Sequence, residues 1–155
     1  MYSIANDADT TSSFTRISSI EFNRKVKWKI TLIMTVLEYG YDLLYIDADV
    51  ILLKNPFPYL MNIQNETFIT QRDTGVCSGF MYIRSDEKTI GFMRYANYFA
   101  QNASQWHDQT IINYCLGQYP IRYYLLPDNL FPSGKVFFEK YQYYWEWNSG
   151  NNTTC

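Results

Sequence analysis

A short apolar run at residues 43–46 constrains the fold of this sequence more than any other feature. The run, Leu43 to Ile46, has the composition of a buried strand and is followed by the acidic residue Asp47. Before it, from about Ile20 to Glu38, apolar residues recur at three- and four-residue steps, which predicts an amphipathic helix. Gly40 stands where the C-cap of that helix requires a left-handed residue. A helix that runs into a buried strand in this way favours an α/β fold.

The rest of the chain continues this alternation of helices and strands. A second apolar run, Val50 to Leu53, is expected to be a strand that ends before Pro56. The later elements are expected to be strands at Phe68–Thr70 and Phe80–Ile83, helices at Thr89–Ala100 and Gln109–Leu116, and a strand at Tyr123–Leu126. Residues 1–19 are polar and rich in Ser and Thr, and we interpret them as a loop or arm. We therefore predict one domain over residues 20–155, in which helices flank a mixed, mostly parallel sheet.

Composition and charge exclude several classes of function. The chain is 47% hydrophobic and 18% charged, which is typical of a soluble globular domain. Its formal net charge of -2 offers no broad attraction for a phosphate backbone, so we expect no nucleic-acid partner. The longest nearly apolar run, Ile30 to Leu37, is far shorter than the roughly twenty residues of a membrane-spanning helix. The N-terminus also lacks the basic and apolar stretches of a signal peptide.

Glycosylation sequons nevertheless suggest a lumenal protein. They begin at Asn65, Asn102, Asn151 and Asn152, which is about twice the number expected by chance. The cysteines Cys77, Cys115 and Cys155 leave at least one thiol unpaired and lack the spacing of a zinc site. The cysteines therefore do not fix the redox compartment.

The candidate functional site is the acidic pair Asp47 and Asp49, which follows the first predicted strand. In an extended chain, residues two apart project to the same side, so both carboxylates can face one point. Two close carboxylates repel each other, and a divalent cation bound by oxygen ligands, Mg²⁺ or Mn²⁺, would relieve that repulsion. In open α/β sheets, ligands bind beyond the carboxyl ends of strands. The same tripeptide at residues 7–9 has no strand before it, and we interpret it as a chance occurrence.

Two chemistries use an acidic pair in this context. In nucleotide-sugar transfer, the pair holds a metal ion that neutralises the leaving diphosphate. In phosphatases of the haloacid-dehalogenase type, Asp47 would be the nucleophile and Asp49 an acid/base. The phosphatase also needs further acidic residues after a later strand, and the segment after Leu126 supplies only Asp128. That hypothesis is therefore the weaker of the two.

Four segments, in order, resemble motifs of the nucleotide-diphospho-sugar transferase family. They are Gly40 to Pro56 around the acidic pair, Cys77 to Ser85, Asp108 to Asn113, and Leu126 to Gly134. The resemblance covers roughly residues 20–140 and implies the A-type glycosyltransferase fold of Golgi enzymes. It also implies a metal-dependent transferase that moves a sugar from a nucleotide-diphosphate donor, above all a UDP-sugar, to a glycan or glycoprotein acceptor.

The resemblance assigns roles to individual residues. Asp47 and Asp49 would bind Mn²⁺ or Mg²⁺ together with the donor diphosphate. Asp108 and Gln109 would be the catalytic residues that face the sugar and the acceptor. A structural alternative makes Asp108 the N-cap of the helix that follows. The only histidine, His107, is interpreted as a loop residue rather than a catalytic base.

Further donor-binding candidates are a glycine and two lysines. Gly79 would let the donor approach the backbone closely, although a strand bulge explains a glycine there equally well. Lys27 or Lys29 would contact phosphate, and the alternative is a solvated basic helix face. Three tryptophans are weaker candidates for stacking on sugar rings: Trp106, Trp145 and Trp147.

The sequence also departs from the family pattern. Cys77 replaces the usual Asn, no unit before residue 20 matches the strand-helix-strand opening of the A-type fold, and no late histidine is available for the metal. We therefore interpret the chain as an incomplete domain from a type II Golgi enzyme whose membrane anchor lies upstream. The alternative is a catalytically inactive protein with the same fold.

Overall fold

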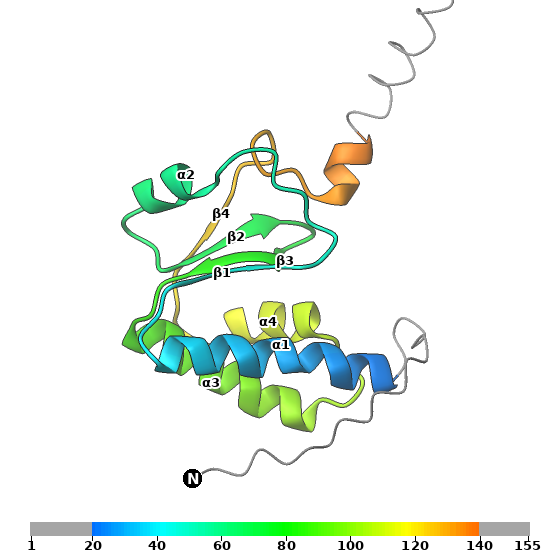
Figure 1. Ribbon diagram of the computed structural model, residues 1–155. Helices are drawn as coiled ribbons and strands as arrows, with labels where there is room; N and C mark the ends of the chain where they lie inside the picture. Colours follow the sequence, from blue (N-terminus) through cyan, green and yellow to red (C-terminus); the bar gives the residue numbers. More distant parts are fainter. Residues whose placement is uncertain (1–19, 140–155) are drawn as a thin grey trace, which may run out of the picture.

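The structure is a computed structural model that describes residues 20–139 (Figure 1). Its labelled helices and strands are, in order, α1 (Ile20–Glu38), β1 (Leu43–Ile46), α2 (Phe57–Asn62), β2 (Phe68–Arg72), β3 (Val76–Ile83), α3 (Glu87–Asn102), α4 (Asp108–Leu116) and β4 (Tyr123–Leu125), and residues 134–139 are also helical. The predicted arm at residues 1–19 and the last part of the predicted domain lie outside the described residues. Within them, no helix combines the length and the apolar character that crossing a bilayer requires.

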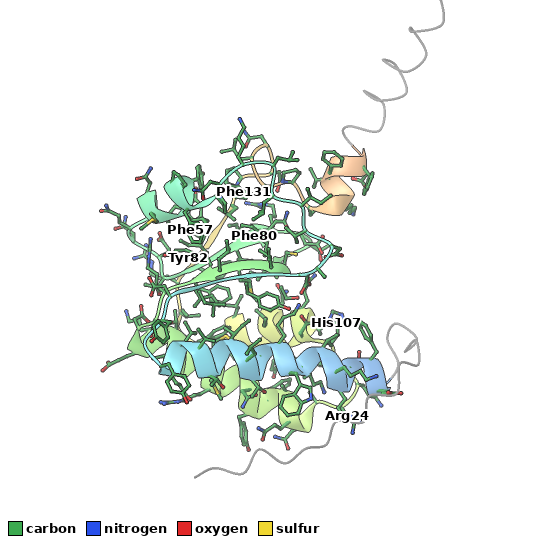
Figure 2. All side chains as sticks on the ribbon, viewed as in Figure 1. Arg24, Phe57, Phe80, Tyr82, His107 and Phe131 are labelled. Carbon is green, nitrogen blue, oxygen red and sulfur yellow. The ribbon has the colours of Figure 1, made fainter. Side chains whose placement is uncertain are left out.

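The sheet lies between two layers of unequal size. Helices α1, α3 and α4 cover one face, and the short α2 lies on the other side (Figure 1). Side chains alternate across the sheet, so that Phe68 and Met81 join the helical core while Ile69 and Phe80 face the opposite side. On that opposite side, aromatic rings gather between α2 and the sheet (Figure 2): Phe57 with Tyr82, and Phe80 with Phe131. Because both faces of the sheet are buried, β3 ends in a continuous apolar run, Phe80 to Ile83, and β2 begins with two apolar residues, Phe68 and Ile69.

The sheet is mixed, but the prediction that it is mostly parallel is wrong. Its strand order is β1-β3-β2-β4. Strand β3 is antiparallel to both β1 and β2, and only β4 runs parallel to its neighbour β2. The physical reason is the short link between β2 and β3, where Asp73 N–H donates to the Gly75 carbonyl at 3.0 Å. So short a connection can join only antiparallel neighbours, whereas parallel strands require a long crossover.

Most individual elements agree with the sequence predictions. The helix over residues 20–38 and the strand over residues 43–46 are confirmed, and Gly40 follows α1 with a positive φ of 82°. Strand β1 is an edge strand whose residues are half-buried or exposed rather than fully buried. The strand predicted for Val50 to Leu53 is wrong, because the chain turns after β1 and leaves Ile51 and Leu53 82% and 86% exposed. The short helix α2 was not predicted.

Gly40 gives a first testable prediction. A Cβ at this position would meet no atom within 4 Å, so only the positive φ opposes a larger residue. We expect Gly40→Ala to lower the free energy of unfolding by about 1 to 2 kcal/mol, measured by urea denaturation. Gly117, which follows α4 with φ of -76°, is the matched control. Gly117→Ala should be neutral or slightly stabilising, and equal losses in both variants would contradict the assignment.

Candidate active site

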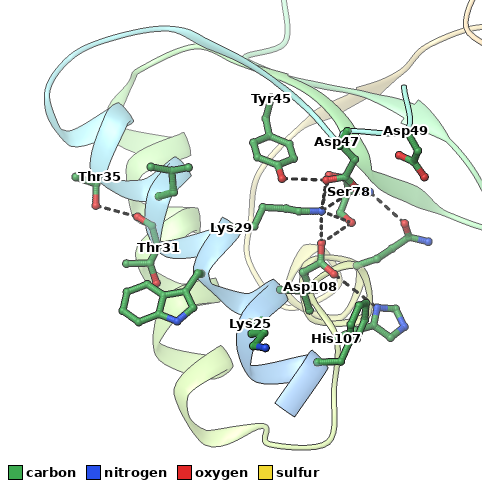
Figure 3. Close-up of a pocket in the computed structure, with 16 residues that line it drawn as sticks. Lys25, Lys29, Thr31, Thr35, Tyr45, Asp47, Asp49, Ser78, His107 and Asp108 are labelled. Atoms are coloured by element: carbon green, nitrogen blue, oxygen red, sulfur yellow. Dashed lines mark hydrogen bonds and ion pairs between the residues drawn. The ribbon is translucent and has the colours of Figure 1, made fainter. Parts of the chain in front are cut away.

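A cavity of about 1110 Å³ opens where α1, the end of β1 and the start of α4 meet (Figure 3). Both members of the predicted acidic pair, Asp47 and Asp49, line it. So do Lys29 from α1, Ser78 from β3 and Asp108 from α4. Small-molecule sites commonly enclose about 300 to 1000 Å³, so this cavity has room for a ligand much larger than a single ring.

Lys29 lies at the centre of the charged groups in this cavity (Figure 3). Its ammonium is 2.5 Å from Asp108 Oδ2 and 3.0 Å from Asp47 Oδ1. It also donates to the Ser78 carbonyl oxygen at 3.3 Å and lies 5.0 Å from the centroid of the Tyr45 ring. Only 9% of the Lys29 side chain is exposed, so one buried cation connects two carboxylates from different parts of the fold.

The two carboxylates keep this buried lysine charged. Burial by itself disfavours the charged ammonium. The hydrogen bonds and charges of Asp108, and then of Asp47, outweigh that effect and raise the pKa of Lys29 above its ordinary value. A positive charge therefore stands at the floor of the cavity throughout the neutral pH range.

Tyr45 holds Asp47 from the other side. Its hydroxyl donates to Asp47 Oδ1 at 2.9 Å. Burial, followed by this hydrogen bond, raises the pKa of Tyr45 to about 12, so the hydroxyl remains a donor. Sequence analysis did not select Tyr45, although its position two residues before Asp47 would place both side chains on the same side of an extended strand.

Asp108 begins helix α4 as a buried anion. The N-cap of α4 is His107, whose side chain accepts from the Thr110 amide, so the structural alternative that made Asp108 the N-cap is wrong. Asp108 accepts from the Ser78 hydroxyl at 2.8 Å in addition to its ion pair with Lys29. Its place in the first turn also suits a negative charge, because the helix dipole is positive at this end. Ser78 is a second site residue that sequence analysis did not select.

Gln109 connects α4 to the link between β2 and β3. Its Nε2 donates to Asp73 Oδ2 at 3.0 Å, and its Oε1 accepts from the Ser78 amide at 3.2 Å. These bonds orient the Gln109 side chain beside Asp108 at the edge of the cavity.

The local geometry of the acidic pair differs from the prediction. The chain does not stay extended, because Val50 N–H donates to the Asp47 carbonyl at 3.1 Å and closes a turn. Asp47 and Asp49 nevertheless line the same cavity (Figure 3). Asp47 is engaged by Lys29 and Tyr45, whereas Asp49 is exposed.

Asp47 and Asp49 fit a divalent cation that is held partly by the protein and partly by a bound diphosphate. In the part of the chain that the structure describes, no three His, Cys, Asp or Glu side chains lie close enough together to hold a metal ion. Mg²⁺ sites commonly use one or two carboxylates, with substrate phosphates and water completing the shell. Asp49 and Asp47 could supply those one or two oxygen ligands, and a diphosphate would supply others.

The structure places the remaining candidates as follows. Gly79 lies against the acidic pair, because a Cβ there would be 3.1 Å from Asp47 Oδ2. It also lies in the part of β3 where the pairing with β2 shifts register, as the bulge alternative requires. Lys27 is not brought to the cavity, since its ammonium donates to the Ala103 carbonyl beyond α3. Cys77 is a half-buried free thiol whose pKa is raised by burial. Trp145 and Trp147 lie outside the described residues.

Comparison with known proteins assigns the chain to a family. The family profile described as nucleotide-diphospho-sugar transferase matches residues 1–154. The chain belongs to the nucleotide-diphospho-sugar transferase family. This membership leaves no support for the phosphatase hypothesis, in which Asp47 would be a nucleophile. The matched region also includes residues 1–19, which the resemblance found in the sequence did not cover.

Individual relatives of this chain are named as glycosyltransferases. The chain is 30% identical over 77 residues to a UDP-galactose:fucoside alpha-3-galactosyltransferase of Dictyostelium discoideum, covering 43% of this chain and 12% of the relative. It is 27% identical over 134 residues to UDP-D-xylose:L-fucose alpha-1,3-D-xylosyltransferase 3 of Arabidopsis thaliana, covering 68% and 35%. It is 40% identical over 52 residues to arabinosyltransferase XEG113 of the same plant, covering 34% and 8%. The chain thus spans about a third or less of the length of these relatives. No solved structure matches significantly.

Proposed function

We propose that this chain carries the donor site of a metal-dependent glycosyltransferase. The observation that supports it best is the position of Asp47 and Asp49 in one cavity with the buried Lys29–Asp108 ion pair. In this proposal the acidic pair lies beside the diphosphate of the donor, and Asp108 and Gln109 lie beside its sugar. A divalent cation held by Asp47 and Asp49 would neutralise the charge that develops on the diphosphate as it leaves.

The chemistry requires little covalent participation by the protein. The bond between the anomeric carbon and the diphosphate oxygen breaks, and its electron pair leaves with the nucleotide. An acceptor hydroxyl oxygen forms the new bond to that carbon, and its proton passes to the departing diphosphate. The contribution of this chain is to fix charges in advance around that carbon. Lys29 does so by holding the Asp47 and Asp108 carboxylates in place while it remains charged itself.

The names of the relatives support a narrower substrate class. Two of them are named for UDP-linked donors and for fucose or fucoside acceptors. We therefore propose a UDP-sugar as the donor and a fucose-containing glycan or glycoprotein as the acceptor. The Golgi lumen is the proposed location, with the membrane anchor outside this chain. Within the described residues, both sequon asparagines, Asn65 and Asn102, are exposed, as lumenal glycosylation requires.

A turnover assay tests this proposal. The purified full chain would be incubated with UDP-galactose or UDP-xylose and methyl α-L-fucoside, and UDP release would be followed with and without Mn²⁺. We expect release that requires Mn²⁺, stops on chelation with EDTA and rises with the acceptor. UDP binding without release from either donor would instead favour the inactive alternative. Release that is indifferent to EDTA would contradict the metal role.

A further inference from the structure

A second cavity of about 500 Å³ lies beside the first, between the start of α4 and the link that joins β2 to β3. His107 and Gln109 line both cavities, so the two meet along these side chains. Figure 3 shows His107 next to Asp108, below Asp47 and Asp49 in this view. The second cavity has the size of a small-molecule site, and apart from His107 and Gln109 its lining residues do not line the donor cavity.

Two aromatic rings form a corner in this second cavity. Trp106 and Tyr114 both line it, with ring centroids 5.2 Å apart and planes inclined at 78°. Phe99 lies behind both rings, 5.3 Å from Trp106 and 4.8 Å from Tyr114. Tyr114 is 41% exposed and Trp106 is half-buried. The corner is therefore supported from behind while it still offers ring surface to a ligand with apolar faces.

The opposite wall of the cavity is held in place by Asn113. Its Oδ1 accepts from the Val76 amide at 2.8 Å, and its Nδ2 donates to the Val76 and Gln109 carbonyls at 2.8 Å and 2.9 Å. Gly75 passes so close that a Cβ on it would collide with Asn113 Oδ1. These contacts hold the link between β2 and β3 against α4. The exposed Thr74 of this link lines the cavity with a polar side chain. Hydrogen bonds within the protein therefore fix this wall of the cavity.

We propose that this second cavity is the acceptor subsite and binds one pyranoside ring of the acceptor against Trp106 and Tyr114. The inference rests on the proposed function, which places the donor sugar at Asp108 and Gln109. A ring in the second cavity would present its hydroxyls across His107 and Gln109 to that sugar. Fucose, the acceptor named for two relatives, carries a methyl group on its ring, and an aromatic corner suits that apolar surface.

Saturation-transfer NMR on the full chain tests the subsite directly. The probes are UDP with Mg²⁺ for the donor cavity and the methyl pyranosides of L-fucose, D-galactose and L-arabinose for the second cavity. We expect signals from UDP and from at least one pyranoside in the wild type. Trp106→Ala and Tyr114→Ala should each abolish the pyranoside signal and keep the UDP signal, which also shows that the variant is folded. Tyr98→Ala, which removes an exposed ring of α3 outside both cavities, is the matched control and should change neither signal.

Kinetics provide the second readout. Trp106→Ala should raise the acceptor KM about tenfold or more while leaving the KM for the UDP-sugar unchanged. The two proposals fail in different ways. Absence of a UDP signal in the wild-type protein would overturn the proposed donor site. A UDP signal without a pyranoside signal, or a pyranoside signal that survives both aromatic substitutions, would overturn the acceptor subsite alone.

Discussion

Replacing Lys29 with methionine is expected to lower the free energy of unfolding by about 3 to 5 kcal/mol. Methionine is close in size to lysine, so the change removes the charge without opening a large cavity. Asp108, whose side chain is 9% exposed, would then be a buried carboxylate left with the Ser78 hydroxyl at 2.8 Å and the His107 ring at 3.9 Å as side-chain neighbours. Asp47 is less affected, because 35% of its side chain is exposed and water can solvate it. The measurement is urea denaturation of the purified variant at neutral pH.

The pH dependence of this loss identifies its cause. Because the pKa of Lys29 is raised, its stabilising charge is fully present below the unfolded value near 10.5 and is lost only as the pH rises through the higher folded value. The loss in Lys29→Met should therefore be constant from neutral pH to about pH 10.

Two further variants serve as controls for Lys29→Met. Adding Asp108→Asn should recover most of the lost stability, because the double variant buries no unpaired charge at α4. Lys25 lies one helical turn before Lys29, and its ion pair with Glu21 is about half exposed on both sides. Lys25→Met should therefore leave the free energy of unfolding nearly unchanged. A loss in Lys25→Met as large as in Lys29→Met would attribute the effect to helix α1 in general and not to the buried network.

The elements around the site could be predicted from sequence, whereas the sheet pairing could not. Helix α1 is predicted by its periodicity and strand β1 by its apolar run, and Gly40 marks the end of the helix. Pairing depends on links between strands, and the available signal was the short Asp73–Gly75 link, which is typical of an antiparallel hairpin. The exposed segment 51–53 shows the limit of hydrophobicity as a signal, since an apolar run does not say whether anything covers it.

The site itself was only partly predictable, for a similar reason. Local motifs identified Asp47, Asp49 and Asp108. Nothing local shows that Lys29, and not Lys27, is the lysine that becomes buried between Asp47 and Asp108. That outcome depends on how α1 packs against β3 and α4, which are distant in sequence. The second cavity likewise requires Trp106 and Gly75 to meet through the fold.

The largest effect on activity is expected for Asp49→Asn, which should reduce Mn²⁺-dependent sugar transfer by about 10²- to 10³-fold. Asparagine keeps the size of the side chain but removes the negative charge that the cation would need. Asp49 is exposed and lies outside the Lys29 network, so the free energy of unfolding should not change. Asp47→Asn should lose both activity and stability, because Asp47 also holds Lys29 and Tyr45. Asp49 is therefore the position that separates the metal role from the structural one.

The chain contains its own control for this experiment. Residues 7–9 repeat the tripeptide Asp-Ala-Asp, and Asp9→Asn makes the same chemical change as Asp49→Asn in the other copy. We expect Asp9→Asn to retain wild-type transfer.

Binding of Mn²⁺, followed by its electron paramagnetic resonance signal, adds a readout that does not depend on turnover. Because no three metal-ligating side chains cluster in residues 20–139, Mn²⁺ should bind tightly only when UDP is present, and Asp49→Asn should weaken that binding. Wild-type transfer and wild-type Mn²⁺ binding in Asp49→Asn would show that the acidic turn is not the metal site, whereas their joint loss, with Asp9→Asn unaffected, would assign the metal to the turn that follows β1.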